Sequence, residues 1–157
     1  MDHDLTLLSH IVLGAVLGFV VGWEREVRGQ DAGARTFALV GAGSAALTVL
    51  AVDEFPATAE RLIAGIVTGV GFIGAGVILH TARGAAKGIT TAAGIWAIAA
   101  TGVLAGAGRL FLAATVTVLV LVVLELRNIP FLRLVDPRRF RDRVTVEDVP
   151  RPTEAEE

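Results

Sequence analysis

Charged and hydroxyl side chains that could bind an ion gather behind the first apolar segment of the chain. The cluster opens with Glu24-Arg25-Glu26 and closes with Arg35-Thr36, and a second polar group, far along the sequence, consists of Lys87, Thr90 and Thr91. Carboxylate and hydroxyl oxygens are ligands that hard cations such as Mg²⁺ prefer. The neighbouring arginines compete for the same carboxylates. Two hypotheses follow: a cation site, or a neutral ion-pair network that locks two loops together.

The spacing inside this cluster predicts one ion pair. If the preceding helix continues, Glu24 and Arg28 form an i,i+4 pair worth a few tenths of a kcal/mol, whereas Arg25 points to a different face. Plain anchoring at a membrane interface is the alternative interpretation. The candidate polar site comprises Glu24, Arg25, Glu26, Arg35, Thr36, Lys87, Thr90 and Thr91.

A glycine motif further along has a nucleotide-binding and a packing interpretation. Residues 69–74 read Gly-Val-Gly-Phe-Ile-Gly, which matches the GxGxxG pattern. That pattern binds dinucleotides only between a strand and a helix, with an acidic residue beyond. Here it lies inside an apolar run without either feature, so we expect it to serve helix packing.

Catalysis finds little support in the composition. The chain has three histidines, two serines and no cysteine, and nothing in the sequence places a nucleophile, a base and an orienting acid together. A net charge of −2 does not indicate a nucleic-acid partner. We therefore predict a protein that is not an enzyme and has no evident cofactor, with Mg²⁺ as the one ion worth testing.

The elements that position these residues are hydrocarbon-length apolar segments. The chain is 54% hydrophobic with a mean hydropathy of +0.67, and a membrane-spanning helix needs about 20 apolar residues. We predict an all-α, polytopic membrane protein whose five-helix transmembrane domain covers residues 1–127. The expected spans are 5–23, 36–52, 62–80, 89–107 and 110–126.

The positions of Lys and Arg predict the orientation. Of the fourteen basic residues, all but Arg61 and Arg109 fall in the segments between spans one and two, between spans three and four, and after span five. Basic residues are retained on the cytoplasmic side. The amino terminus should therefore be outside and the carboxyl terminus cytoplasmic. The proline-rich segment 128–157 should be a cytoplasmic tail that is either disordered or lying on the membrane.

Glycines mark the helix faces that we expect to pack. Small residues let membrane helices approach closely. In the 5–23 span, a glycine recurs every four residues. We expect spans one, three and four to form the interior and the last span to face lipid. The stripe in the first span could serve a dimer or packing within one chain. The predicted packing glycines are Gly14, Gly18, Gly22, Gly65, Gly69, Gly71, Gly74, Gly76, Gly102 and Gly106.

Three ordered motifs resemble those of the MgtC/SapB family of bacterial membrane proteins. The first is Gly22-Trp-Glu-Arg-Glu26 followed by Ala32-Gly-Ala-Arg-Thr36, the second is 69–78, and the third runs from Lys87-Gly-Ile-Thr-Thr91 to the turn at 106–108. The match covers roughly residues 10–127 in order and spacing. It implies a five-span bundle in the bacterial inner membrane and a role when magnesium is scarce.

The resemblance also implies differences. The chain looks like a short form that lacks the soluble cytoplasmic domain of the best-known members. Phe37 stands where the family often has His, Gly65 where Gln is frequent, and Leu110 where an aromatic residue is usual. The first two changes remove polar groups, so a binding role that depended on them would be weaker here.

Two functions remain in view. The first is a non-catalytic regulator that supports magnesium or ion homeostasis through contacts with itself, as a dimer, or with another membrane protein. The alternative is a channel or transporter for Mg²⁺ or another small cation. The absence of acidic and basic residues from the middle of every predicted span favours the first.

Overall fold

The computed structural model describes residues 1–80 and 88–126, apart from the side chains of residues 79 and 80. The helices are α1 (Asp2–Val27), α2 (Ala34–Glu54), the short 3₁₀ helix η1 (Pro56–Thr58), α3 (Ala59–His80), α4 (Ile89–Gly106) and α5 (Leu110–Glu125). Within these described residues there is no strand, so the predicted all-helical fold is confirmed. Lys87 and the tail 128–157 lie outside them, and the predictions made for those residues stay predictions.

In the described part of the chain, four helical segments are long and apolar enough to cross a membrane. They are α1, α2, α4 and the segment Pro56–Ile78, which joins η1 to α3. The fifth, α5, is equally apolar but has 16 residues, or about 24 Å of helix against a hydrocarbon core of about 30 Å. Large apolar side chains such as Leu39, Phe72 and Phe111 face outward. This is the pattern of a multi-pass membrane protein.

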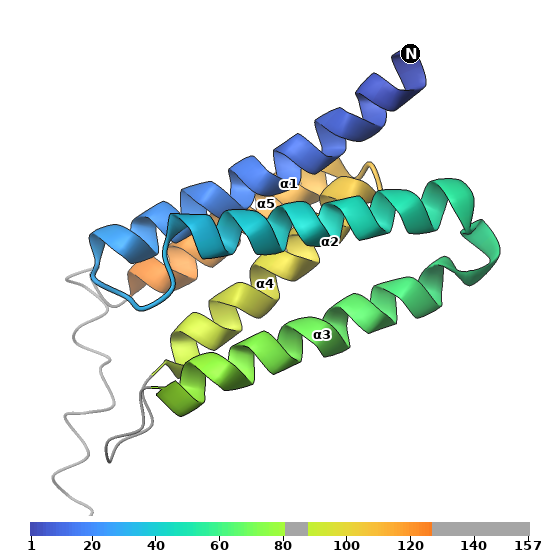
Figure 1. Cartoon of the computed structure of the whole chain (residues 1–157). Coiled ribbons are helices and arrows are strands. Elements are labelled where there is room, and N and C mark those ends of the chain that lie inside the picture. Colours follow the sequence, from blue (N-terminus) through green and yellow to red (C-terminus); the bar gives the residue numbers. More distant parts are fainter. Residues whose placement is uncertain (81–87, 127–157) are drawn as a thin grey trace, which may run out of the picture. The chain divides into compact units, whose positions relative to one another are not determined.

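Successive helices run in opposite directions (Figure 1). The α1–α2 connection and the start of α4 therefore lie at one end of the compact unit formed by Met1–Val123, and the α2–α3 and α4–α5 connections lie at the other. This arrangement brings the polar cluster of the α1–α2 junction and the described threonines Thr90 and Thr91 to the same end.

The interior is built around α2, which packs against α1, α3 and α4. A Cβ placed on Gly14 would lie 2.8 Å from the carbonyl oxygen of Gly41, and one placed on Gly22 would lie 2.7 Å from the Cα of Ala34. On the other side, a Cβ on Gly102 would lie 2.5 Å from the same Gly41 oxygen. Real Cβ atoms do not approach so closely, so only glycine permits these contacts.

We expected spans one, three and four to form the tightly packed interior. This prediction is wrong for span three, because α2 occupies the position expected for α3. A Cβ built on Gly65, Gly69, Gly71 or Gly76 would meet nothing within 4 Å. Among the predicted packing glycines of α3, Gly74 alone is in contact, at an ordinary 3.5 Å from the Cβ of Ala92. The glycines of α3 leave space rather than fill it.

Candidate functional site

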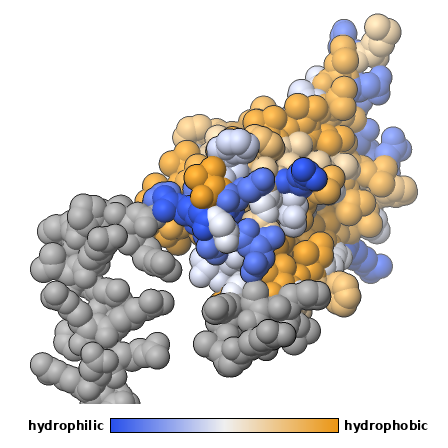
Figure 2. Space-filling model, turned by 60° about the vertical axis from the view of Figure 1, so that its left-hand side comes forward, coloured by the Kyte–Doolittle hydropathy of each residue, from blue (hydrophilic) through white to orange (hydrophobic). Residues whose placement is uncertain are grey.

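The polar cluster forms one end of the described unit. Figure 2 turns this end toward the reader and shows hydrophilic side chains gathered between hydrophobic flanks. The cluster is built where α1 ends and α2 begins. Its charged groups sit directly above the helix contacts made by Gly22, so their positions are fixed by the packing of α1 on α2.

Glu24 binds two arginines at once. Its Oε2 accepts a hydrogen bond from the Nε of Arg25 at 2.5 Å, and its Oε1 accepts from Nη2 of Arg25 at 2.7 Å and from Nε of Arg28 at 2.5 Å. The i,i+4 pair predicted for Glu24 and Arg28 is thus present. The expectation that Arg25 points to a different face is wrong, because its guanidinium turns back onto its neighbour and is buried, with 5% of the residue exposed.

Glu26 performs a different task, which is to cap α2. Its Oε2 accepts a hydrogen bond of 2.9 Å from the backbone N–H of Ala34, the first residue of α2. The N-cap residue itself is Gly33, which has no side chain to satisfy that group. A carboxylate here also opposes the positive end of the helix dipole. Gly29, at φ 65°, allows the chain to turn between the two helices.

Phe37 is a packing position beside the cluster that the predicted site residues did not include. It is fully buried, and its side chain lies against Gly22 of α1 and Gly94 of α4. The side chain of Phe37, which belongs to α2, therefore lies against both α1 and α4 near the charged cluster. The resemblance had drawn attention to this position, but only for the polar group that it lacks.

The remaining site residues are dispersed at the same end. Thr91 is buried in the first turn of α4, while Thr90 and Arg35 are exposed and Thr36 is half-buried. Lys87 lies outside the described residues. Among the described residues, no hydrogen bond joins Thr90 or Thr91 to Glu24 or Glu26. The structure thus joins Glu24 to Arg25 and Arg28, whereas the described threonines share this end without a bond to either glutamate.

Three of the four carboxylate oxygens of Glu24 and Glu26 already accept hydrogen bonds. Both oxygens of Glu24 are held by guanidinium groups, and one oxygen of Glu26 is held by a backbone N–H. In the described part of the chain, no three His, Asp or Glu residues are grouped so as to hold a metal ion. Of the two hypotheses for the cluster, this geometry favours the ion-pair network.

Three buried threonine hydroxyls of the interior donate hydrogen bonds within their own helices. Thr48 donates to the carbonyl of Ser44 at 2.8 Å, Thr101 to that of Ala97 at 3.1 Å, and Thr117 to that of Ala113 at 2.9 Å. Each bond spans four residues of one helix. The glycine contacts bring both α1 and α4 close to the backbone of α2.

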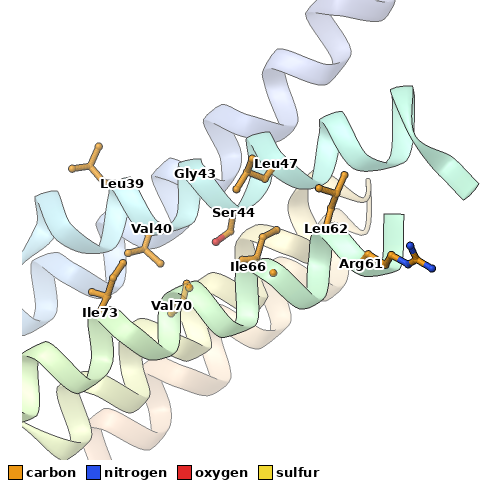
Figure 3. A pocket seen from close by; sticks show the side chains of 12 residues that line it. Leu39, Val40, Gly43, Ser44, Leu47, Arg61, Leu62, Ile66, Val70 and Ile73 are labelled. Carbon is orange, nitrogen blue, oxygen red and sulfur yellow. The ribbon is translucent and has the colours of Figure 1, made fainter. Parts of the chain in front are cut away.

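A cavity of about 600 Å³ lies between α2 and α3 (Figure 3). Apolar side chains and open glycines line it, including Leu39, Gly65 and Ile73. Its polar side chains are those of Ser44 and, at one end, Arg61. The sequence signal for this cavity was the glycine content of α3, which had been interpreted as packing.

Comparison with known proteins gives the same family as the sequence motifs. The model of the MgtC family matches residues 11–129. The chain is 40% identical over 127 residues to a protein of Escherichia coli K12 named "Putative magnesium transporter YhiD", an alignment that covers 75% of this chain and 59% of that protein. It is 39% identical over 119 residues to "Protein MgtC" of Salmonella typhimurium LT2, covering 76% and 49%.

An uncharacterized protein of Haemophilus influenzae is 40% identical over 135 residues, which is 80% of this chain and 56% of that protein. The chain thus spans roughly half to three-fifths of the curated relatives that it matches. No solved structure matches.

Proposed function

We propose that this chain, which belongs to the MgtC family, is a non-catalytic inner-membrane protein that supports magnesium homeostasis by acting on other membrane machinery. The membership confirms the resemblance found in the three motifs. The link to magnesium rests on the relative named as a magnesium transporter. The observation that carries the choice of a regulator is the close packing of α1 and α4 against α2, where glycines lie against the α2 backbone.

The proposal includes an orientation. We place all five helices across the bacterial inner membrane, with the amino terminus outside and the carboxyl terminus in the cytoplasm. The distribution of Lys and Arg supports this, as does the antiparallel order of the helices (Figure 1). The α1–α2 ion-pair network then lies at the cytoplasmic surface, where it rigidifies the junction that a partner would contact.

A second candidate function is transport of Mg²⁺ or another small cation. The name of the Escherichia coli relative favours it, and so does the open backbone of α3 at Gly65 and Gly69. Backbone carbonyls can line an ion pathway without charged side chains. We would place such a pathway along α3, because α1 and α4 pack closely against α2.

Partner contact is the direct test of the regulatory proposal. We would place a photo-crosslinking amino acid at Phe72 or at Phe111, which are 84% and 81% exposed, and express each variant in bacteria grown in limiting magnesium. The proposal expects a discrete adduct, either with a second copy or with another membrane protein. The proposal would be contradicted if the variants supported growth in limiting magnesium and neither position gave an adduct with any protein.

A further inference from the structure

The α2–α3 cavity differs from ordinary lipid-facing surface because it is a groove with a charged end. The groove is deepened by three glycines that have no side chain to fill it, Gly43 on α2 and Gly65 and Gly69 on α3. A Cβ at any of them would meet nothing within 4 Å. Its remaining lining is apolar apart from Ser44 and Arg61. Such a lining suits a molecule that is apolar along most of its length and anionic at one end.

Arg61 supplies the charge at that end. Figure 3 shows its side chain at one extremity of the row of lining residues, directed away from them. It is exposed, and it forms no ion pair or hydrogen bond with any residue that the structure describes. A guanidinium at a membrane interface matches the geometry of a phosphate group.

The length of the groove matches one leaflet. Twelve residues separate Arg61 from Ile73, and at 1.5 Å per residue this is about 18 Å. Half of the hydrocarbon core is about 15 Å thick. A lipid whose head group lies at Arg61 therefore has its acyl chain ending near Ile73.

A second helix fits this space less well than an acyl chain does. A helix about 10 Å wide and 18 Å long occupies roughly 1,400 Å³, more than the whole non-atom space of about 1110 Å³ in the cavity and its opening. It would lie across the opening and leave the floor at Gly65 and Gly69 empty. An acyl chain is narrow enough to reach that floor.

We propose that the groove between α2 and α3 is a phospholipid-binding site, in which the acyl chain lies over Gly65 and Gly69 and the lipid phosphate pairs with Arg61. The site goes beyond the proposed function, because it requires only that the protein be in a membrane. The bound lipid completes the contact between α3 and α2 that the glycines leave open.

Photo-labelling in vesicles tests the site. The full chain is reconstituted into vesicles of phosphatidylethanolamine and phosphatidylglycerol that contain a trace of phosphatidylglycerol with a diazirine in its acyl chain. After irradiation, the label on each peptide is measured by mass spectrometry. We expect the segments 39–47 and 62–73 to carry more label than the exposed face of α5. Arg61→Gln should lower the labelling of these two segments about tenfold.

Glycine substitutions supply matched controls. In Gly65→Leu and Gly69→Leu the new Cβ meets no protein atom within 4 Å and the rest of the side chain occupies the groove. Each should therefore abolish groove labelling while the helix content is unchanged. Gly71→Leu makes the same chemical change at an equally open position outside the groove and should have no effect. Gly43→Leu, on the opposite wall, repeats the test if an α3 variant fails to fold.

The phosphate requirement is tested with diacylglycerol that carries the same diazirine chain, and with free inorganic phosphate as a competitor. We expect weak labelling by diacylglycerol and no competition by phosphate. Equal labelling by diacylglycerol, uniform labelling of all exposed helices, unchanged labelling in Gly65→Leu, or a crosslinked second copy in the groove would each overturn the proposal. Loss of the lipid site with intact growth in low magnesium would leave the proposed function standing.

Discussion

Glu24 holds two arginines whose surroundings differ, and this difference determines what each contributes. Arg25 is almost entirely buried, whereas the side chain of Arg28 is 37% exposed. A surface ion pair is worth at most about 1 kcal/mol. A buried cation that loses its partner costs several times as much, because its desolvation is no longer compensated.

We therefore predict that Glu24→Gln lowers the free energy of unfolding by about 3 kcal/mol, since it strands the buried charge of Arg25. Arg28→Gln should lower it by less than about 1 kcal/mol. Denaturant titration of the protein in detergent micelles, followed by circular dichroism, measures both. Equal effects of the two substitutions would show that Arg25 is not held as described.

The sequence predicted part of this network. The i,i+4 spacing of Glu24 and Arg28 was sufficient to predict their ion pair, because residues at this spacing are neighbours on a helix. The bond between Glu24 and Arg25 was not predictable, because adjacent helical residues do not normally face each other. It forms because Arg25 is buried and has to satisfy its donors locally. The capping role of Glu26 depended on where α2 begins, which spacing alone did not fix.

Helix α2 is the element on which the fold depends. It presents backbone and small side chains to both α1 and α4, and the carbonyl of Gly41 lies between Gly14 and Gly102. Helix contacts of this kind depend on close approach, because hydrophobic burial does not drive association within lipid. The glycine stripe of α1 thus serves packing within one chain, which was one of the two alternatives weighed from the sequence.

This arrangement predicts that Gly18→Leu prevents α1 from packing on α2. A Cβ on Gly18 would meet the backbone of Phe37, which cannot move aside as a flexible side chain could. We expect a loss of at least about 3 kcal/mol, the upper end of typical overpacking costs. Gly71→Leu, at an open position of α3, is the control and should be nearly neutral. Unfolding in detergent compares them, and a neutral Gly18→Leu would refute this packing.

The regular stripe of α1 was predictable as a packing face, but its partner was not. α3 has more glycines than α2, and their number suggested that it belonged to the interior. Close packing requires a complementary small face on the neighbouring helix, and α2 supplies it through Ala34, Gly41 and Ala45. That face repeats less regularly than the stripe of α1, so it did not stand out in the sequence.

At the scale of the whole molecule, the antiparallel order of the helices places the α1–α2 network and the start of α4 on the same side (Figure 1). Twelve of the fourteen basic residues belong to the segments assigned to that side. The family and its helical nature were thus readable from the sequence, because motif spacing and hydropathy are local properties. The open α2–α3 groove was not, because it depends on how two helices diverge.

The orientation can be tested readily because the chain contains no cysteine. We predict that Asp4→Cys reacts with a membrane-impermeant maleimide in intact spheroplasts, and that Arg139→Cys reacts only after the cells are permeabilised. Denatured samples of each variant show that both thiols can react. The reverse pattern would place the basic segments outside and contradict the proposed orientation.

The most direct test of the central claim is a magnesium flux measurement. The purified chain is reconstituted into vesicles that contain a magnesium-sensitive dye, with an inward Mg²⁺ gradient and protein-free vesicles as the control. A regulator that does not itself conduct Mg²⁺ should give the same slow influx in both preparations. Influx that exceeds the control and rises in proportion to the amount of folded protein would contradict it, and would establish the chain as a transporter.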